Sequence, residues 1–168
     1  ARVLCDKFAT PFIRTNPSTD IYGTEYAAVL KNIYALGVGI AVGLGYGDNF
    51  LAVLVSNAAT EMGRFLKESY DSPRDITSSP YLGDLLVTCY SQFSRNRTFG
   101  TLMGRGYSVE SAMTGMNMVA EGYYAAACIH RVNERFGIDI PIADAVYRIL
   151  YEHALPAEEM EKVTARLL

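Results

Sequence analysis

The sequence of 168 residues contains no tryptophan, two histidines and three cysteines. The cysteines, at positions 5, 89 and 128, lie far apart and show neither metal-ligand spacing nor a CxxC motif. An odd number of such thiols favours reduced, structural cysteines. The N-terminal residues also lack the pattern of a secretion signal. We therefore expect a cytoplasmic protein without a metal.

The sequence also lacks a large excess of either positive or negative charge. The net charge is −3, which gives no basic surface for nucleic acid or for an anionic membrane. The longest apolar stretch, residues 33–46, is shorter than a bilayer-spanning helix and rich in glycine. Because 50% of the residues are hydrophobic, the chain can bury one substantial core. We expect one helical domain with no nucleic-acid partner and no membrane insertion.

Candidate β-strands are nearly absent. Residues 11–17, bounded by two prolines, could form one short strand, and no second candidate of similar quality follows. A strand without a partner cannot satisfy its backbone groups. We therefore expect its partner strands to lie upstream of this sequence, and residues 1–9 to have helical character.

Most of the remaining chain has apolar residues at a spacing near 3.6, which predicts helices. Ser18 or Thr19 can cap the first helix, Pro73 and Asp75 signal another helix start, and Gly137 predicts a helix end. The predicted helices cover residues 18–45, 49–70, 94–104, 108–113, 119–136, 141–151 and 156–168, with a further start near residue 72. The predicted architecture is all-α.

Three glycines, Gly37, Gly39 and Gly43, superficially resemble a dinucleotide-binding pattern. The last gap is one residue too long, and no strand precedes the segment. We interpret these glycines as positions where a neighbouring helix or a ligand comes close, at a cost of about 1 kcal/mol each in helix propensity.

Lys31 is the first residue that could carry chemistry, because its helical neighbours are almost wholly apolar. Such a lysine either extends its ammonium to water at the rim of a helix bundle or lines a cleft, where it could transfer protons. Asn32 follows it and supplies a donor and an acceptor. The pattern alone leaves both interpretations open.

Asp84 and Thr88 are four residues apart, so a helix places them on one face. Asp84 could orient a lysine and Thr88 could hydrogen bond a substrate oxygen, or Asp84 could simply cap the helix that follows Gly83. Glu121 is an isolated acidic residue that would otherwise be interpreted as a surface residue.

The segment from Ser94 to Arg97 predicts an anion site. Ser94 is a good N-cap, yet Arg95 and Arg97 place positive charge at the positive end of the helix dipole. A phosphate on the free N–H groups would relieve this conflict, with Arg95 and Asn96 beside it. The alternative is that the arginines point into water.

These blocks together resemble the C-terminal domain of NAD(P)-dependent glycerol-3-phosphate dehydrogenase. The sequence carries, in order, GTEYAAVLKNI at residues 23–33, GLGYGDN at 43–49, LGDL at 82–85, SRNRTFG at 94–100, VAEG at 119–122 and related residues at 141–152. The resemblance extends from about residue 12 to the end of the chain. It implies an all-α multi-helix bundle of the 6-phosphogluconate dehydrogenase C-terminal-like type, spanning residues 18–168. Residues 1–17 would be a remnant of the upstream Rossmann domain and the linker.

The resemblance also implies roles for individual residues in hydride transfer between a nicotinamide and glycerol 3-phosphate or dihydroxyacetone phosphate. Lys31 and Asp84 match the catalytic pair. The residues that match substrate contacts are Lys31, Asn32, Asp84, Thr88, Ser94, Arg95 and Asn96, and those that match cofactor contacts are Arg95, Val119 and Glu121. NAD or NADP would be bound mostly by the N-terminal Rossmann domain, which would be the partner of this one. The phosphorylated substrate is small, and homo-oligomerisation stays open.

Some positions depart from the family pattern. Tyr26-Ala27-Ala28 replaces a small, often glycine-containing triplet, and Tyr81 and Ala120 vary positions that flank the motifs. None of these changes removes a chemical group from the predicted site. Two other hypotheses stay open at this point, a two-domain dehydrogenase of another hydroxy acid and a stand-alone helical binding module.

Overall fold

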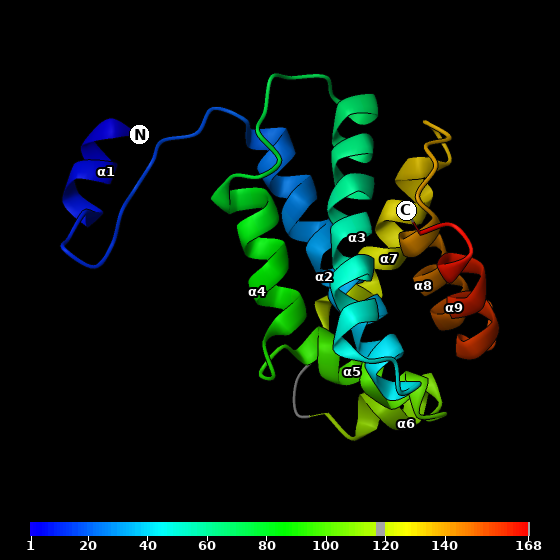
Figure 1. Cartoon of the computed structure of the whole chain (residues 1–168). Coiled ribbons are helices and arrows are strands. Elements are labelled where there is room, and N and C mark those ends of the chain that lie inside the picture. Colours follow the sequence, from blue (N-terminus) through cyan, green and yellow to red (C-terminus); the bar gives the residue numbers. More distant parts are fainter. Residues whose placement is uncertain (117–119, 168) are drawn as a thin grey trace.

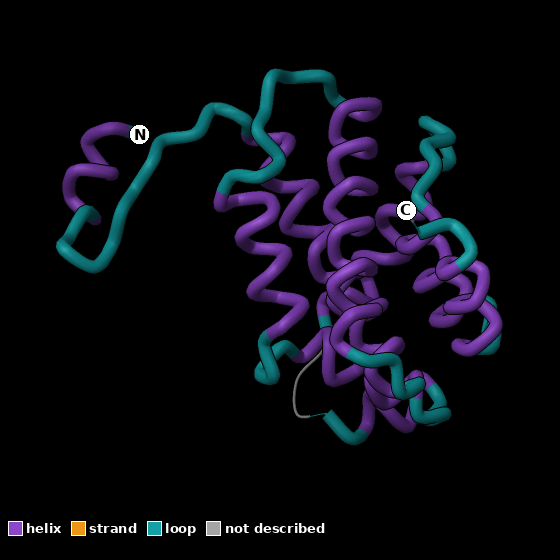
Figure 2. The backbone as a smooth tube through the Cα atoms, viewed as in Figure 1, coloured by secondary structure: helices purple, strands orange, loops and turns teal. Residues whose placement is uncertain are grey.

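The computed structural model describes residues 1–116 and 120–167, and the regular elements in those residues are all helices (Figure 2). The all-α prediction is therefore confirmed. The elements, in chain order, are α1 (Arg2–Phe8), α2 (Ile21–Gly43), α3 (Asp48–Ser69), the π-helix η1 (Ser79–Gly83), α4 (Asp84–Tyr90), α5 (Arg95–Gly104), α6 (Val109–Thr114), α7 (Glu121–Asn133), α8 (Pro141–Tyr151) and α9 (Pro156–Thr164).

Helix α2 lies at the centre of the bundle, with α3, α4, α5, α7 and α8 packed around it (Figure 1). Its apolar residues, among them Leu30, Ile33, Leu36 and Ile40, are buried on several sides. By length and composition α2 could cross a membrane, but 61% of its most apolar stretch is buried among the other helices. A helix that is apolar all round suits this central position.

Glycines bring α2 and α5 into backbone contact. A Cβ atom added at Gly39 would lie 2.1 Å from the carbonyl oxygen of Arg97, and one added at Gly100 would lie 2.1 Å from that of Leu36. Gly43 and Gly104 meet the opposite backbone in the same way. The prediction that the glycines of residues 37–43 serve close approach is confirmed, and the approaching element is a helix.

The start of α2 differs from the prediction. Asp20, and not Ser18 or Thr19, caps the helix by accepting a hydrogen bond from the Gly23 backbone N–H at 3.0 Å. Ser18 instead accepts a hydrogen bond from the Asp20 backbone N–H at 3.2 Å. A carboxylate serves well here because the N-terminal end of a helix favours negative charge.

The helix start predicted near residue 72 is wrong. Residues 71–78 form a loop, and the next helical turn is η1. Pro73 and Asp75 satisfied a local helix-start rule, but the side chain of Arg74 is held by Asp20 at 2.8 Å. An ion pair with a residue distant in the sequence therefore holds this loop.

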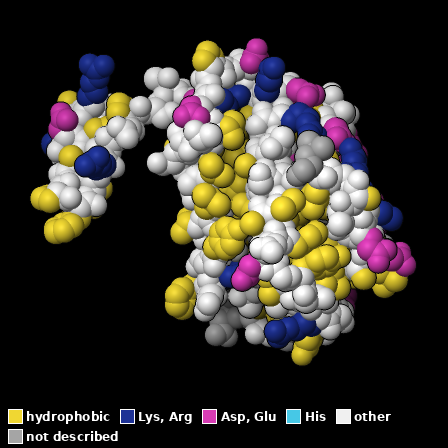
Figure 3. Space-filling view, viewed as in Figure 1, with side chains coloured by type: hydrophobic (Ala, Val, Ile, Leu, Met, Phe, Trp, Pro, Cys, Tyr) yellow, Lys and Arg dark blue, Asp and Glu magenta, His cyan; other side chains and the backbone are white. Residues whose placement is uncertain are grey.

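Residues 11–17, which could form a strand only beside upstream partner strands, are an irregular segment in this chain, so the strand stays a prediction. Without a partner strand they have no ladder to join. Figure 1 shows α1 standing apart from the bundle at the end of this segment, and Figure 3 shows apolar side chains on its surface. The large exposed ones are Val3, Leu4, Phe8, Phe12 and Ile13. The domain boundary after residue 17 stays a prediction.

Candidate functional site

Lys31 and Asp84 form the centre of the candidate site. The Lys31 Nζ lies 2.6 Å from Asp84 Oδ2, and the two side chains are 22% and 36% exposed. Lys31 projects from the middle of α2, and Asp84 is the first residue of α4. The ammonium is thus partly shielded and paired with a carboxylate, and the interpretation of Lys31 as a cleft residue stays a prediction.

Asp84 does not cap its own helix through its side chain, so that alternative is wrong. Its carboxylate turns to Lys31, while its backbone N–H donates to the carbonyl oxygens of Ser79 and Tyr81 in η1. Thr88 lies one turn further along α4 and donates its hydroxyl to the backbone oxygen of Asp84 at 2.6 Å. The predicted helical pair therefore exists, with Thr88 directed at the backbone of Asp84.

The helix start at Ser94 forms as predicted. The Ser94 Oγ accepts a hydrogen bond from the Arg97 backbone N–H at 3.3 Å, and α5 begins at Arg95. Arg97 donates from its guanidinium to the carbonyl oxygen of Tyr90 at the end of α4, at 2.8 Å. The arginines thus do not simply point into water, because Arg97 joins two helices and its charge lies at the negative end of a helix dipole.

Asn96 is buried and connects three helices. Its Nδ2 donates to Asn32 Oδ1 on α2 at 2.9 Å, and its Oδ1 accepts from the Gly122 backbone N–H on α7 at 2.8 Å. A Cβ atom at Gly122 would lie 2.6 Å from the Asn32 backbone oxygen, so only glycine fits there. These contacts fix the orientation of the Asn32 amide next to Lys31.

Arg95 and Glu121 face each other at the rim. The Arg95 Nη2 lies 3.6 Å from Glu121 Oε1, and the side chains are 41% and 68% exposed. Together with Asn32, Thr88, Ser94 and Asn96 they line an open depression of about 320 Å³. The depression thus brings together five predicted substrate residues and Glu121, a predicted cofactor contact. The Lys31–Asp84 pair lies next to it, because Lys31 precedes Asn32 on α2 and Asp84 lies one turn before Thr88 on α4. Val119, the remaining predicted cofactor contact, lies outside the described residues.

The depression suits a small anion or polar molecule. The guanidinium of Arg95, the start of α5 and the Ser94 hydroxyl supply positive potential and polar groups. Arg95 and Glu121 are exposed enough to contact a bound molecule. Among residues 1–116 and 120–167, no group of three or more His, Cys, Asp or Glu side chains could hold a metal ion.

Sequence reasoning missed a polar cluster that lies next to this site. Asp20 lies at a predicted helix start where the pattern favours Ser18 or Thr19 as the cap. Arg74 lies in the false helix start near residue 72, and Tyr81 only departs from the family pattern beside a motif. The carboxylate of Asp20 binds both of the other side chains. The sequence around Arg74 does not reveal its ion pair, because the partner, Asp20, lies 54 residues away.

Comparison with known proteins identifies a family that matches most of the chain. A family model described as the C-terminus of NAD-dependent glycerol-3-phosphate dehydrogenase matches residues 20–161. A glycerol-3-phosphate dehydrogenase, NAD(P)+, of Chlorobium phaeobacteroides is 40% identical over 154 residues, which cover 92% of this chain and 46% of the relative. One of Syntrophomonas wolfei is 40% identical over 161 residues, covering 96% and 47%. The chain spans about half the length of the curated relatives that it matches.

Solved structures show the same helical arrangement. The crystal structure of a glycerol-3-phosphate dehydrogenase from Coxiella burnetii matches with a TM-score of 0.92 and 31% identity, covering 97% of this chain and 50% of that one. A yeast protein of the same description matches with a TM-score of 0.86 and 27% identity, covering 95% and 47%.

Proposed function

The chain belongs to the family of NAD-dependent glycerol-3-phosphate dehydrogenases, as its C-terminal part, and we propose that it forms the substrate half of an enzyme that interconverts glycerol 3-phosphate and dihydroxyacetone phosphate. The observation that carries this proposal is the 2.6 Å contact between Lys31 Nζ and Asp84 Oδ2. It supplies a directed ammonium beside a depression that suits a phosphate-bearing substrate.

Lys31 is the proton donor in this proposal. As a hydride reaches the C2 carbon of dihydroxyacetone phosphate, negative charge develops on the C2 oxygen. The Lys31 ammonium stabilises that charge and transfers its proton to the oxygen, which completes the alcohol. In the opposite direction the neutral amine accepts the hydroxyl proton. Asp84 holds the amine at the reacting oxygen by its contact with Nζ, and it serves a substrate hydroxyl as well.

The phosphate end of the substrate belongs at the start of α5. Arg95 supplies a charged, bidentate donor, and Ser94 and Asn96 flank it. Thr88 and Asn32 line the same depression and contact the three-carbon chain. Arg95 is paired with Glu121 at 3.6 Å, a loose contact that a dianionic phosphate can displace.

NAD or NADP supplies the hydride when bound, and an N-terminal nucleotide-binding domain holds most of it in this proposal. This chain contributes Arg95 and Glu121 at the rim, and Val119, which lies two residues before Glu121 in the sequence. A cytoplasmic location remains part of the proposal.

Replacing Lys31 tests the proposal in the full-length protein. Lys31→Ala should lower kcat for dihydroxyacetone phosphate at least about 100-fold, the lower end of what positioned acid–base catalysis contributes. KM should change much less, because the lost interaction forms mainly in the transition state. Steady-state kinetics measures both values. Lys67→Ala, at an exposed position of α3, is the matched control and should change neither. Near-normal kcat in Lys31→Ala would contradict the mechanism.

A further inference from the structure

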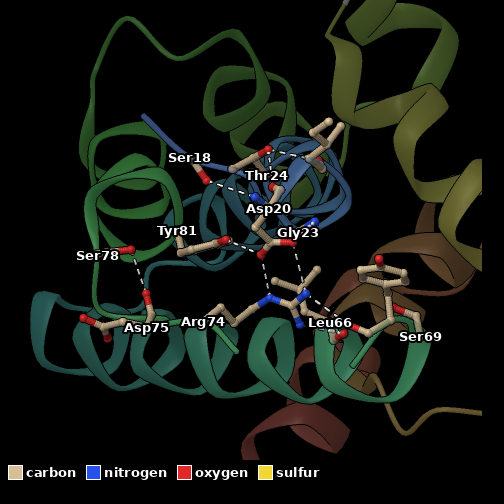
Figure 4. A network of polar contacts seen from close by, with 12 residues as sticks. Ser18, Asp20, Gly23, Thr24, Leu66, Ser69, Arg74, Asp75, Ser78 and Tyr81 are labelled. Atoms are coloured by element: carbon tan, nitrogen blue, oxygen red, sulfur yellow. Dashed lines mark hydrogen bonds and ion pairs between the residues drawn. The ribbon is translucent and has the colours of Figure 1, made fainter. Parts of the chain in front are cut away.

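A buried cluster of three side chains lies beside the Lys31–Asp84 pair and has no role in the chemistry described above. The carboxylate of Asp20 accepts hydrogen bonds from Arg74 Nε at 2.8 Å, from Arg74 Nη2 at 3.3 Å and from the Tyr81 hydroxyl at 2.5 Å (Figure 4). The same carboxylate caps α2 through the Gly23 backbone N–H. A single acidic group thus holds three separate segments of the chain.

The cluster is shielded from water, and each of its three side chains is hydrogen bonded. The side chains of Asp20 and Arg74 are only 10% and 6% exposed, and Tyr81 is buried. Arg74 also donates to the carbonyl oxygens of Leu66 and Tyr70 at the end of α3. The guanidinium hydrogen bond lowers the pKa of Asp20 to about 2, so the carboxylate stays charged at neutral pH. A charge-assisted network of this kind is rigid, because losing one partner leaves another buried group unsatisfied.

The two ends of the cluster lead directly to the two members of the candidate catalytic pair. Asp20 begins α2, which carries Lys31. Tyr81 lies within η1, three residues before Asp84, and the Asp84 backbone N–H donates to the Tyr81 carbonyl oxygen. Asp84, Asp20, Arg74 and Tyr81 also line one common depression. The Tyr81 hydroxyl therefore joins the start of α2, which carries Lys31, to η1, which directly precedes Asp84.

The element that Tyr81 connects to α2, η1, is a single π-helical turn. Single π-helical turns are rare, are less regular than α-helix and occur frequently at functional sites. We propose that Tyr81 is a positioning residue, whose hydrogen bond to Asp20 holds η1 against α2 so that Asp84 meets Lys31. This inference rests on the proposed function, because it assigns Tyr81 an effect on the same reaction.

The test removes the hydroxyl alone. In the full-length protein, Tyr81→Phe keeps the ring in place and leaves the Asp20–Arg74 pair intact. We expect kcat for dihydroxyacetone phosphate to fall about tenfold, since a displacement of about 1 Å at a catalytic group can cost about 100-fold. KM for both substrates should stay within about twofold, because Tyr81 does not line the depression proposed to hold the substrate.

Tyr151→Phe is the matched control. Its hydroxyl also donates to a partly buried acceptor, the Tyr123 carbonyl oxygen at 2.8 Å, but it joins α7 to α8. We expect thermal unfolding to show a similar loss of stability in both variants, and a loss of kcat in Tyr81→Phe alone. A crystal structure of Tyr81→Phe in the 168-residue chain should show the 2.6 Å contact between Lys31 and Asp84 lengthened or lost.

The outcomes separate this inference from the proposed function. Unchanged kcat in a folded Tyr81→Phe variant of an active enzyme would overturn the positioning role and leave the function standing. A loss of kcat with the Lys31–Asp84 contact intact would overturn it too, because Tyr81 would then act by another route. An inactive wild-type enzyme would overturn the proposed function, and the positioning role with it.

Discussion

At the residue scale, Glu61 is a carboxylate inside the helical core. It is buried, and it accepts hydrogen bonds from the backbone N–H groups of Ile142 at 2.8 Å and Ala143 at 3.0 Å, at the start of α8. Burial raises the pKa of Glu61 to about 7, because loss of water outweighs the help from these donors. Glu61 therefore changes charge near neutral pH inside the bundle.

This shift predicts a pH-dependent stability. The folded state holds a proton on Glu61 more tightly than the unfolded state, whose ordinary value is 4.5. The stabilising contribution is complete below that value and is lost as the pH rises to about 7, by about 3 kcal/mol in total. Urea unfolding of wild type and of Glu61→Gln at pH 5 and pH 8 should show this decline only in wild type. Glu68→Gln, at an exposed position on the same helix, should keep it; an equal decline in all three proteins would assign the pH dependence elsewhere.

Arg95 binds the phosphate group of the substrate in the proposed function. In the full-length protein, Arg95→Ala should lower kcat/KM for dihydroxyacetone phosphate roughly 10- to 150-fold, the worth of a charge-assisted contact of about 1.5–3 kcal/mol. Phosphite added with glycolaldehyde, a substrate that lacks the phosphate, should activate wild type and not the variant. Arg105→Ala, an exposed residue at the far end of α5, is the charge control and should respond as wild type does. Equal activation of wild type and Arg95→Ala would place the phosphate site elsewhere.

At the scale of elements, the α2–α5 contact depends on glycine. Gly100→Ala should lower the free energy of unfolding by at least about 2 kcal/mol, because the added Cβ would lie 2.1 Å from the Leu36 carbonyl oxygen and the helices must separate. Gly63→Ala is the control within α3, where the new Cβ meets the Ile76 side chain at 3.4 Å. That change should be neutral or stabilise by up to about 1 kcal/mol. Denaturant unfolding measures both, and a Gly100→Ala protein as stable as wild type would contradict the close packing.

Elements that depend on local pattern could be predicted from the sequence. The apolar spacing of α3 and α8, the Ser94 cap of α5 and the turn at Gly137, whose φ is +66°, are set by neighbours within a few residues. The false helix start near residue 72 shows the limit of such rules. Arg74 is held by a side chain 54 residues earlier, and no local pattern contains that partner.

The same limit applies to the site. Sequence motifs identified Lys31 and Asp84, but the residues by themselves left Lys31 open between the rim and a cleft. The choice depends on how α2 packs against α4, which brings together residues 53 positions apart. The bond between Tyr81 and Asp20 likewise requires η1 to lie against the start of α2.

At the scale of the whole molecule, the helical domain supplies one wall of the proposed reaction site. Its candidate substrate groups lie on α2 and on α4 and at the start of α5. Both α4 and α5 pack against α2. Its candidate cofactor groups are few and lie at the rim, at Arg95 and Glu121. The chain also covers only 46% of the relative from Chlorobium phaeobacteroides. In the proposed function, a nucleotide-binding domain that accounts for part of the remaining length holds most of the cofactor.

This division predicts the behaviour of the 168-residue chain by itself. It should fold, because α2 is surrounded by packed helices, yet it should not reduce dihydroxyacetone phosphate with NADH or NADPH, since a hydride transfer requires a held nicotinamide. Absorbance at the reduced nicotinamide band measures turnover, and circular dichroism confirms that the tested protein is helical. As a positive control, the same chain joined to the nucleotide-binding domain of a relative should gain activity that Lys31→Ala removes. Turnover by the chain alone would show that it binds the nucleotide with its own residues. Many more residues than Arg95 and Glu121 would then have to contact the cofactor.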